Sequence, residues 1–285
     1  MTTQRMFAAV ALGLFLVAPR PAKAQYDFTT IDVPGAASTA VNGNSPNAIA
    51  GEFNDAAGNT HGFVLSKGVY TTIDVPGAAS TTVNGINANG ELAGIYNDGT
   101  RFHGYFWSNG VFTTLDPPGS IRTQAGFLNA QGQVVGTYRD PSNKRHGFVW
   151  SKGAYTTFNV PNDHPLFGTV AFGINDDGEV VGDYVDAGGT RRGFVLSQGV
   201  YTTLVPPGSV LTVAEGINNP GLIAGVYFDG AGNEHGFLFN GVYTTIDVPG
   251  STATAVFSVN AQAQIVGSYD DAGGVTHGYV GTPAH

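Results

Sequence analysis

The chain has 285 residues, of which 42 are glycine and none is cysteine. Glycine, at about 15%, has twice its usual share, whereas charged residues, at 12%, have about half of theirs. This composition excludes a disulfide scaffold, a coiled coil and a charge-rich disordered chain, and 42% hydrophobic residues suffice for a core. The net charge of −9 argues against nucleic acids and anionic lipid surfaces as partners.

Residues 1–24 are predicted to be a secretory signal peptide. An apolar run covers 7–18, and a small-x-small triplet ends at Ala24. The run is too short to cross about 30 Å of hydrocarbon, so an uncleaved membrane anchor is the weaker alternative. Cleavage between Ala24 and Gln25 removes three cations and takes the net charge from −9 to −12. We therefore expect an extracellular or periplasmic protein without a membrane span.

One phrase, an aromatic residue followed by Thr-Thr, a branched apolar residue and in most copies Asp-Val-Pro-Gly or Asp-Pro-Pro-Gly, recurs along the mature chain. The Thr-Thr pairs begin at positions 29, 71, 113, 156, 202 and 244, so the spacings are 42, 42, 43, 46 and 42 residues. Repeats of 40 to 45 residues are typical of β-propeller blades. Six such units account for a single domain over residues 25–285.

Each unit divides into four short strands, which in the second unit are expected over 81–86, 91–96, 103–107 and 111–115. Gly-rich turns separate them, and proline falls only in turns or between units. The predicted fold is therefore all-β, a six-bladed β-propeller of four-stranded antiparallel blades. The mature chain begins on a fourth-strand phrase and ends on a third strand, so the N-terminal strand is expected to close the last blade. The predicted blades cover about 38–76, 80–117, 121–161, 168–206, 210–248, and 252–281 together with 26–33.

Two short motifs recur in most units, as in Ile174-Asn-Asp-Asp-Gly-Glu-Val-Val-Gly182 and His146-Gly-Phe-Val-Trp150. The pattern resembles the bacterial extracellular HAF repeat, with His-Gly-Phe or His-Gly-Tyr in place of His-Ala-Phe. The resemblance covers the whole mature chain and implies export and a repeat fold. It brings no catalytic residues to carry over.

Repeated Asn and Gly residues are interpreted as architectural. An asparagine that opens the turn between the first and second strands is expected to cap that turn through its own side chain. These asparagines are Asn87, Asn129, Asn175, Asn218 and Asn260. A glycine is expected at the end of each second strand, where inner strands crowd the axis. These glycines are Gly51, Gly94, Gly136, Gly182, Gly225 and Gly267.

An aspartate recurs in the turn between the second and third strands, and a histidine recurs where the third strand begins. The aspartates are Asp55, Asp98, Asp140, Asp186, Asp229 and Asp271, and the histidines are His61, His103, His146, His235 and His277. Arg192 replaces the histidine in the fourth blade. We interpret these residues as structural: Asp caps the turn, and His forms hydrogen bonds within or between blades. One Asp and one His per blade do not supply the three ligands that a metal needs, so no metal or cofactor is predicted, although a channel-bound cation such as calcium stays open.

The same turns and the connections between blades are expected on one face, which would be acidic because the connections also carry Asp32, Asp74, Asp116 and Asp247. The repeat is least regular after the third blade, where residues 162–168 lengthen the connection. Four residues near this break are candidate ligand-binding residues that we expect to converge: Asp163, His164, Asp186 and Arg192.

No catalytic residue is predicted. The chain lacks cysteine, a Gly-x-Ser-x-Gly elbow, a phosphate-binding Gly loop and a His-Glu-x-x-His pair. The sequence favours an exported, non-catalytic, monomeric binding or scaffold protein that recognises a glycan, a peptide or a cell-surface partner on the acidic face. Two alternatives are a secreted hydrolase or lyase with a site near His164, and a structural extracellular repeat protein.

Overall fold

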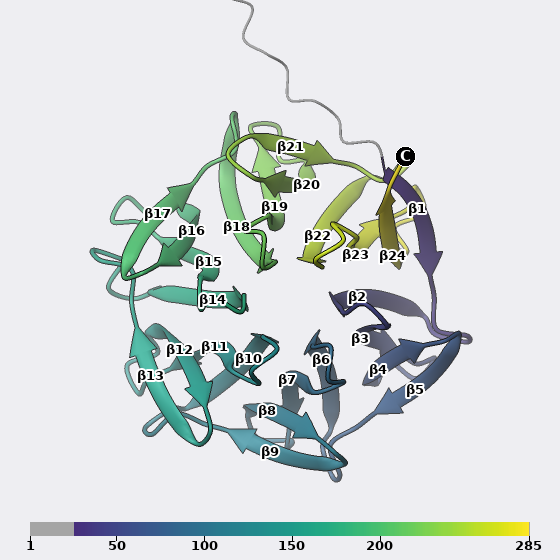
Figure 1. The fold of residues 1–285 in the computed structure, drawn as a ribbon, viewed down its shortest axis with the longest axis horizontal. Helices are drawn as coiled ribbons and strands as arrows, with labels where there is room; N and C mark the ends of the chain where they lie inside the picture. Colours follow the sequence, from purple (N-terminus) through teal and green to yellow (C-terminus); the bar gives the residue numbers. More distant parts are fainter. Residues whose placement is uncertain (1–25, 285) are drawn as a thin grey trace, which may run out of the picture.

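The computed structural model describes residues 26–284, and the predicted signal peptide lies outside them. These residues form 24 β-strands in six four-stranded antiparallel sheets, arranged as blades around a central axis (Figure 1). The six-bladed β-propeller predicted from the repeat is confirmed. Within the described part of the chain, no helix could cross a membrane.

Each blade runs from an inner strand beside the axis to an outer strand at the rim (Figure 1). Blade 1 contains β2 (Ser38–Asn44), β3 (Ala48–Asn54), β4 (Thr60–Ser66) and β5 (Val69–Ile73). Blade 2 contains β6 (Ser80–Ile86), β7 (Leu92–Asn97), β8 (Phe102–Ser108) and β9 (Val111–Leu115). Blade 3 contains β10 (Arg122–Leu128), β11 (Val134–Arg139), β12 (Arg145–Ser151) and β13 (Ala154–Phe158).

The remaining blades follow the same order. Blade 4 contains β14 (Thr169–Ile174), β15 (Val180–Val185), β16 (Arg191–Ser197) and β17 (Val200–Leu204). Blade 5 contains β18 (Ser209–Ile217), β19 (Ile223–Asp229), β20 (Glu234–Phe239) and β21 (Tyr243–Ile246). Blade 6 contains β22 (Ala253–Val259), β23 (Ile265–Asp270), β24 (Thr276–Pro283) and β1 (Tyr26–Ile31).

The two ends of the described chain close the ring. Strand β1 pairs antiparallel with β24, from Tyr26 opposite Pro283 to Ile31 opposite Gly278. The Phe28 ring packs edge-on against the buried Tyr279 ring, with centroids 5.5 Å apart. As predicted from the phrase order, the N-terminal strand thus becomes the outer strand of the last blade, so no inner sheet edge is left open there.

The His-Gly-aromatic motif places one large ring per blade in the core. The ring comes from the third strand and is at most 1% exposed in every blade. These rings belong to Phe63, Tyr105, Phe148, Phe194, Phe237 and Tyr279. They lie among apolar side chains of the inner strands, such as Val41 and Val266, which come from neighbouring blades. Burial of this repeated layer is the main source of stability.

The glycine of the second strand lies inside the strand rather than at its end, which corrects the prediction. Gly51, for example, lies in the middle of β3. A Cβ atom there would lie 2.0 Å from the carbonyl oxygen of Ala40 and 3.0 Å from the Phe63 ring. The glycine is therefore needed because the inner strand and the core ring approach its backbone so closely.

Replacing this glycine should destabilise the fold strongly. We expect Gly51→Ala to lower the free energy of unfolding by about 2–3 kcal/mol, because the added methyl group must displace backbone or ring atoms. Gly230→Ala is the matched control, since a Cβ there meets nothing within 4 Å, and it should change stability by less than about 0.5 kcal/mol. Urea unfolding of both variants checks this, and equal midpoints would contradict it.

Candidate functional site

The turns between second and third strands and the connections between blades lie on one face of the ring, which we call the corner face. Contacts across this face show the arrangement. In blade 1, His61 at the start of β4 lies 3.6 Å from Asp55 of the turn and 2.9 Å from Asp74 of the next connection. The corner face therefore holds the turn aspartates, the connection aspartates and the repeated histidines, as the topology predicted.

Each turn aspartate receives hydrogen bonds from its own turn. In blade 5, Asp229 accepts one from the Asn233 side chain at 2.9 Å and two from the backbone N–H groups of Asn233 and Ala231. These bonds, that from the Asn233 side chain foremost, hold the pKa of Asp229 at about 2. The pKa of the turn aspartate is lowered in all six blades, at Asp55, Asp98, Asp140, Asp186, Asp229 and Asp271. The carboxylate is thus committed to shaping the turn.

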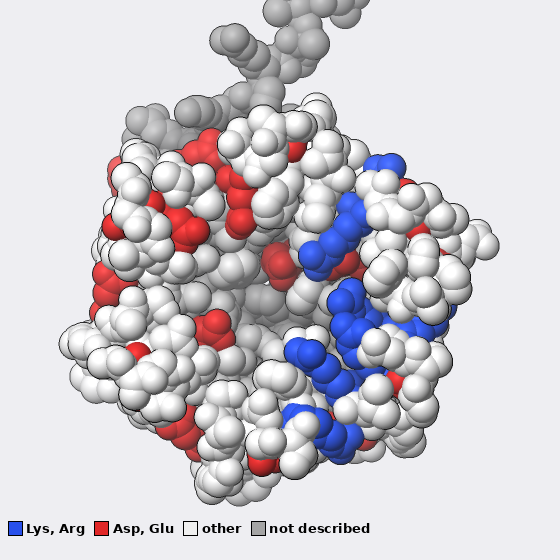
Figure 2. All heavy atoms as spheres, turned by 180° about the vertical axis from the view of Figure 1, so that it is seen from behind, with Lys and Arg blue, Asp and Glu red and all other residues white. Residues whose placement is uncertain are grey.

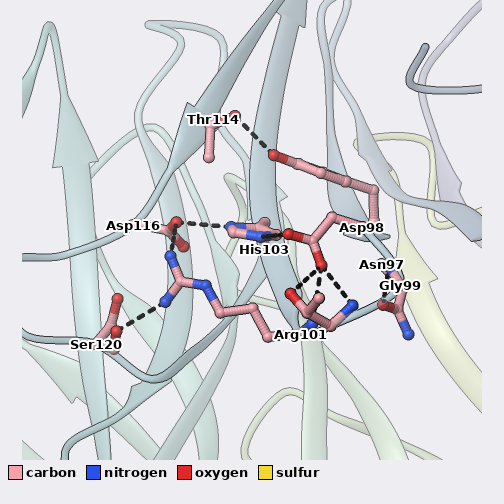
Figure 3. Close-up of polar contacts among 10 residues, drawn as sticks. Asn97, Asp98, Gly99, Arg101, His103, Thr114, Asp116 and Ser120 are labelled. Carbon is pink, nitrogen blue, oxygen red and sulfur yellow. Dashed lines mark hydrogen bonds and ion pairs between the residues drawn. The ribbon is translucent and has the colours of Figure 1, made fainter. Parts of the chain in front are cut away.

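The repeated histidine bridges the turn to the following connection. In blade 2, His103 Nδ1 lies 2.7 Å from Asp116 and Nε2 lies 3.1 Å from Asp98 (Figure 3). Its ring stacks on Tyr96 at a centroid distance of 4.8 Å. Similar bridges are made by His61, His146, His235 and His277, with Asn159 in place of the connection aspartate in blade 3.

The flanking carboxylates favour the charged imidazolium. The hydrogen bond with Asp74 is the main reason that the pKa of His61 is raised. Around His277, burial opposes the charged form, but the carboxylates of Asp32 and Asp271 outweigh it and the pKa is raised. These histidines therefore act as cationic cross-links between the turn and the connection.

Two clefts open on the corner face at consecutive blade junctions. The cleft between blades 5 and 6 has a volume of about 390 Å³ and is lined by His235, Asp247 and the connection that follows β21. The cleft between blades 6 and 1 has a volume of about 220 Å³ and is lined by the equivalent His277, Asp32 and the connection that follows β1. The same repeat positions thus form two adjacent clefts with the same chemistry.

The residue two positions before the histidine distinguishes these junctions from two others. At the open clefts this residue is short, and it is Asn233 or Val275. After blade 2, Arg101 crosses the junction and donates to Asp116 at 2.9 Å and to the carbonyl oxygen of Ser120 at 2.9 Å (Figure 3). After blade 3, Lys144 likewise reaches Asp163 at 2.9 Å. A long cation at this position therefore spans the space that is a cleft elsewhere.

The four candidate residues near the irregular connection do not form one constellation. Asp186 pairs with Arg192 at 2.7 Å. Asp163, with 6% of its side chain exposed, is held by Lys144 and by the Thr169 hydroxyl. The backbone N–H of His164 donates to the carbonyl oxygen of Val185, next to Asp186. Within residues 26–284, no hydrogen bond or ion pair joins the side chains of Asp163 or His164 to those of the other pair.

The corner face is not acidic throughout, which corrects the expectation. Seven Lys and Arg residues lie in its turns and at adjoining strand ends in blades 2 to 4, and Figure 2 shows such residues gathered over one sector beside the channel mouth. They are Arg101, Arg122, Arg139, Lys144, Arg145, Arg191 and Arg192. We call this region the basic sector. It was missed because its members occupy different positions of the repeat and come together only in the fold.

A cavity of about 260 Å³ lies between the inner strands, with both charged and aromatic walls. The phenyl rings of Phe127, Phe172 and Phe257 line it together with the carboxyl groups of Glu52 and Glu215. Burial raises the pKa of both carboxyl groups, that of Glu215 to about 8. Across residues 26–284, no group of three His, Asp or Glu side chains has the arrangement of metal ligands.

On the opposite face, the repeated asparagines cap turns and also connect blades. Asn129 accepts the backbone N–H groups of Gln131 and Gln133, and its Nδ2 donates to the carbonyl oxygen of Asn175 in the next blade at 3.1 Å. Equivalent bonds between blades start from Asn87, Asn175 and Asn218. The turn role followed from the sequence, whereas the bond between blades did not, because it depends on how blades stack.

No protein-family model and no curated protein sequence matches the chain, so its resemblance to the HAF repeat stays a prediction. Solved β-propellers are similar in fold. TolB from Acinetobacter baumannii has a TM-score of 0.58 at 13% identity, over 83% of this chain and 64% of that one. A triple-arginine mutant of AofleA from Arthrobotrys oligospora has a TM-score of 0.53 at 14% identity, over 90% and 86%. Aleuria aurantia lectin in complex with α-methyl-L-fucoside has a TM-score of 0.52 at 11% identity, over 88% and 93%. At such identities, the likeness shows the β-propeller fold alone.

The raised pKa of Glu215 should make stability depend on pH in a recognisable way. Its folded pKa of about 8 lies above the ordinary value of 4.5, so its contribution to stability is fully present below pH 4.5 and is lost as the pH rises through 8. We expect Glu215→Gln to raise the melting temperature by roughly 2–4 °C at pH 9, about 1 kcal/mol for a domain of this size, and to leave it unchanged at pH 4.

Calorimetry at both pH values tests this expectation. Asp27→Asn, at an exposed position on β1, is the control that removes a carboxylate from the surface. If Glu215→Gln and Asp27→Asn shift the melting temperature equally at pH 9, the assignment of the effect to channel burial is wrong.

Proposed function

We propose that the protein is a carbohydrate-binding propeller that holds saccharide units in the equivalent clefts of the corner face, without catalysis, metal or cofactor. The observation that carries this proposal is the repetition of one cleft at two adjacent junctions. An enzyme needs one asymmetric constellation of acid, base or nucleophile. A polymer with repeated units is instead matched by repeated, equivalent sites.

The cleft walls have the groups that saccharide hydroxyls require. Asp247 and Asp32 keep 34% and 48% of their side chains exposed, so their carboxylates have acceptor capacity beyond their histidine bonds. His235 and His277 hold those carboxylates in place at 2.8 and 3.1 Å. Hydrogen bonds to ionised groups are stronger than neutral ones, and carboxylates fixed in advance lose little entropy on binding.

The fold comparison supports a glycan over a peptide or another cell-surface partner. Aleuria aurantia lectin, a six-bladed propeller of similar fold, is described in complex with α-methyl-L-fucoside and with Fucα1-6GlcNAc. The same architecture is therefore able to recognise sugars. We further propose that residues 1–24 direct export and that the mature monomer meets its ligand outside the cytoplasm.

The alternatives have less support. For a hydrolase or lyase near His164, the neighbouring Asp163 would be the natural carboxylate, but Lys144 and Thr169 already hold it. For a purely structural repeat protein, nothing requires two open clefts on one face. Binding to a peptide partner is an outcome that the following experiments would reveal by the absence of glycan binding.

Glycan-array screening and affinity electrophoresis of residues 25–285 in polysaccharide gels test the proposal. We expect retention by at least one polysaccharide. His235→Ala and His277→Ala should each weaken retention several-fold, and the double variant should weaken it by about 10²-fold or more because avidity is lost. His146→Ala is the matched control, since it removes the same kind of bridge at a junction that Lys144 already spans.

Binding to no glycan would overturn the proposal. So would equal losses of retention in the His146→Ala and His235→Ala variants, because the effect would then reflect the weakened bridge rather than the cleft.

A reciprocal exchange tests whether the position before the histidine controls the cleft. Blade 2 retains the complete set of Asp98, His103 and Asp116, so Arg101→Asn should open a third cleft and strengthen retention about tenfold. Asn233→Arg should close the cleft between blades 5 and 6 and weaken retention several-fold. Affinity electrophoresis compares both variants with the parent, and effects of the same sign in the two variants would contradict the assigned role.

A further inference from the structure

Three arginines face one another across adjacent strands of blade 3. Arg122 on β10 lies opposite Arg139 on β11, and Arg139 lies opposite Arg145 on β12. Residues that are directly opposite on antiparallel strands have Cβ atoms about 4.5–5.5 Å apart and share one side of the sheet, so like charges there repel. We call these residues the arginine ladder. The equivalent positions of blade 1 are Ser38, Asn54 and Thr60, which are uncharged.

The ladder differs from the rest of the basic sector because its charges lack counter-charges. The other four cations of the sector each reach a carboxylate within 3 Å, in the pairs Arg101–Asp116, Lys144–Asp163, Arg191–Asp183 and Arg192–Asp186. Within residues 26–284, no carboxylate forms an ion pair with any ladder residue. The unbalanced charge is therefore confined to these three residues.

The polar contacts of the ladder also leave donors free. Arg139 Nη1 donates only to Asn143, at 2.9 Å to the side-chain oxygen and 3.2 Å to the backbone oxygen. Arg122 places its guanidinium over the Phe102 ring at 4.4 Å, while its buried Nε atom has no hydrogen-bond partner. Arg145 makes no side-chain hydrogen bond to any residue between 26 and 284. A buried donor without a partner costs about 1–3 kcal/mol, and more when it is charged.

The electrostatics of Arg145 agree with this geometry. Burial is the first cause that lowers the pKa of its guanidinium, and the charge of Arg139 is the second. Arg191 adds to the lowering, whereas the carboxylate of Asp183 opposes it. The ladder thus keeps half-buried cations close together at a net cost in free energy, which an anion in contact with them would remove.

We propose that the arginine ladder binds an oxyanion, the carboxylate or sulfate group of an acidic ligand, at the channel mouth of blade 3. The guanidinium group presents its donors in a planar fork that matches such a group with two parallel hydrogen bonds. The ladder begins on the inner strand β10, and the basic sector of Figure 2 adjoins the channel mouth. This site is separate from the clefts between blades 5, 6 and 1 and does not depend on their function.

Isothermal titration at constant ionic strength tests the site with four probes. Sodium glucuronate and sodium sulfate supply the oxyanion as small ions, glucose is the neutral match of glucuronate, and polygalacturonate supplies carboxylates on a polymer. We expect binding of both small anions, no binding of glucose, and binding of polygalacturonate at least tenfold tighter per chain if the anion belongs to a polysaccharide. Equal affinity per carboxylate for glucuronate and polygalacturonate would identify a free small anion as the ligand.

Variants separate the site from general charge effects. Arg139→Gln should weaken glucuronate binding at least tenfold, and Arg139→Lys should restore it only partly, because lysine keeps the charge but loses the fork. Lys152→Gln, in the turn before β13 on the opposite face, is the control and should leave binding unchanged. His235→Ala should also leave it unchanged, so failure of this site and failure of the clefts are distinguishable.

Stability without ligand gives a second readout that a structural role would reverse. Removing one like charge from the ladder should raise the melting temperature of Arg139→Gln above that of the parent protein, and 50 mM sulfate should raise the melting temperature of the parent more than that of the variant. A lower melting temperature in the variant, together with no stabilisation of the parent by sulfate, would overturn the proposal. Equal loss of anion binding in Lys152→Gln would also overturn it.

Discussion

The structure depends on the close stacking of neighbouring β-sheets around an axis. In each blade, a core ring from the third strand packs over a glycine of the second strand, and the carbonyl oxygen of the inner strand comes so near that a methyl group would not fit. This contact sets the spacing between strands and positions the turns at both ends of each blade. Everything on the corner face follows from it, because a blade that cannot bend or slip holds its turns in fixed places.

On that rigid support, small changes of side chain produce large differences in surface. The bridge from turn aspartate through histidine to connection is nearly constant, whereas the residue two positions before the histidine is long at two junctions and short at the two clefts. Blade 3 departs further, with arginines at three positions that are uncharged in blade 1. The repeat thus provides the scaffold, and departures from it distinguish one sector of the ring from another.

The sequence predicted the fold well because its information is local and repeated six times. Strand lengths, turn glycines, the turn role of Asp229 and the closing role of the N-terminal strand all depend on neighbours in sequence or on the order of phrases. What it missed depends on contacts between repeats. Asn129 bonds to the next blade, Lys144 occupies the Asp163 carboxylate, and the arginines of the basic sector meet although no motif unites them. Stacking distances and side-chain reach decide these features, and neither can be read from a single repeat.

The pairing of β1 with β24 has a consequence for the order in which the molecule forms. Tyr26 and Pro283 lie at opposite ends of the described chain, so the first strand to be synthesised is the last to find its partner. Until then, blade 6 has three strands and the first strand has none. Contacts of such sequence separation are slow to form because the loop that they close is long. The molecule therefore spends its maturation as an open arc with an exposed edge, and only the complete chain becomes a ring.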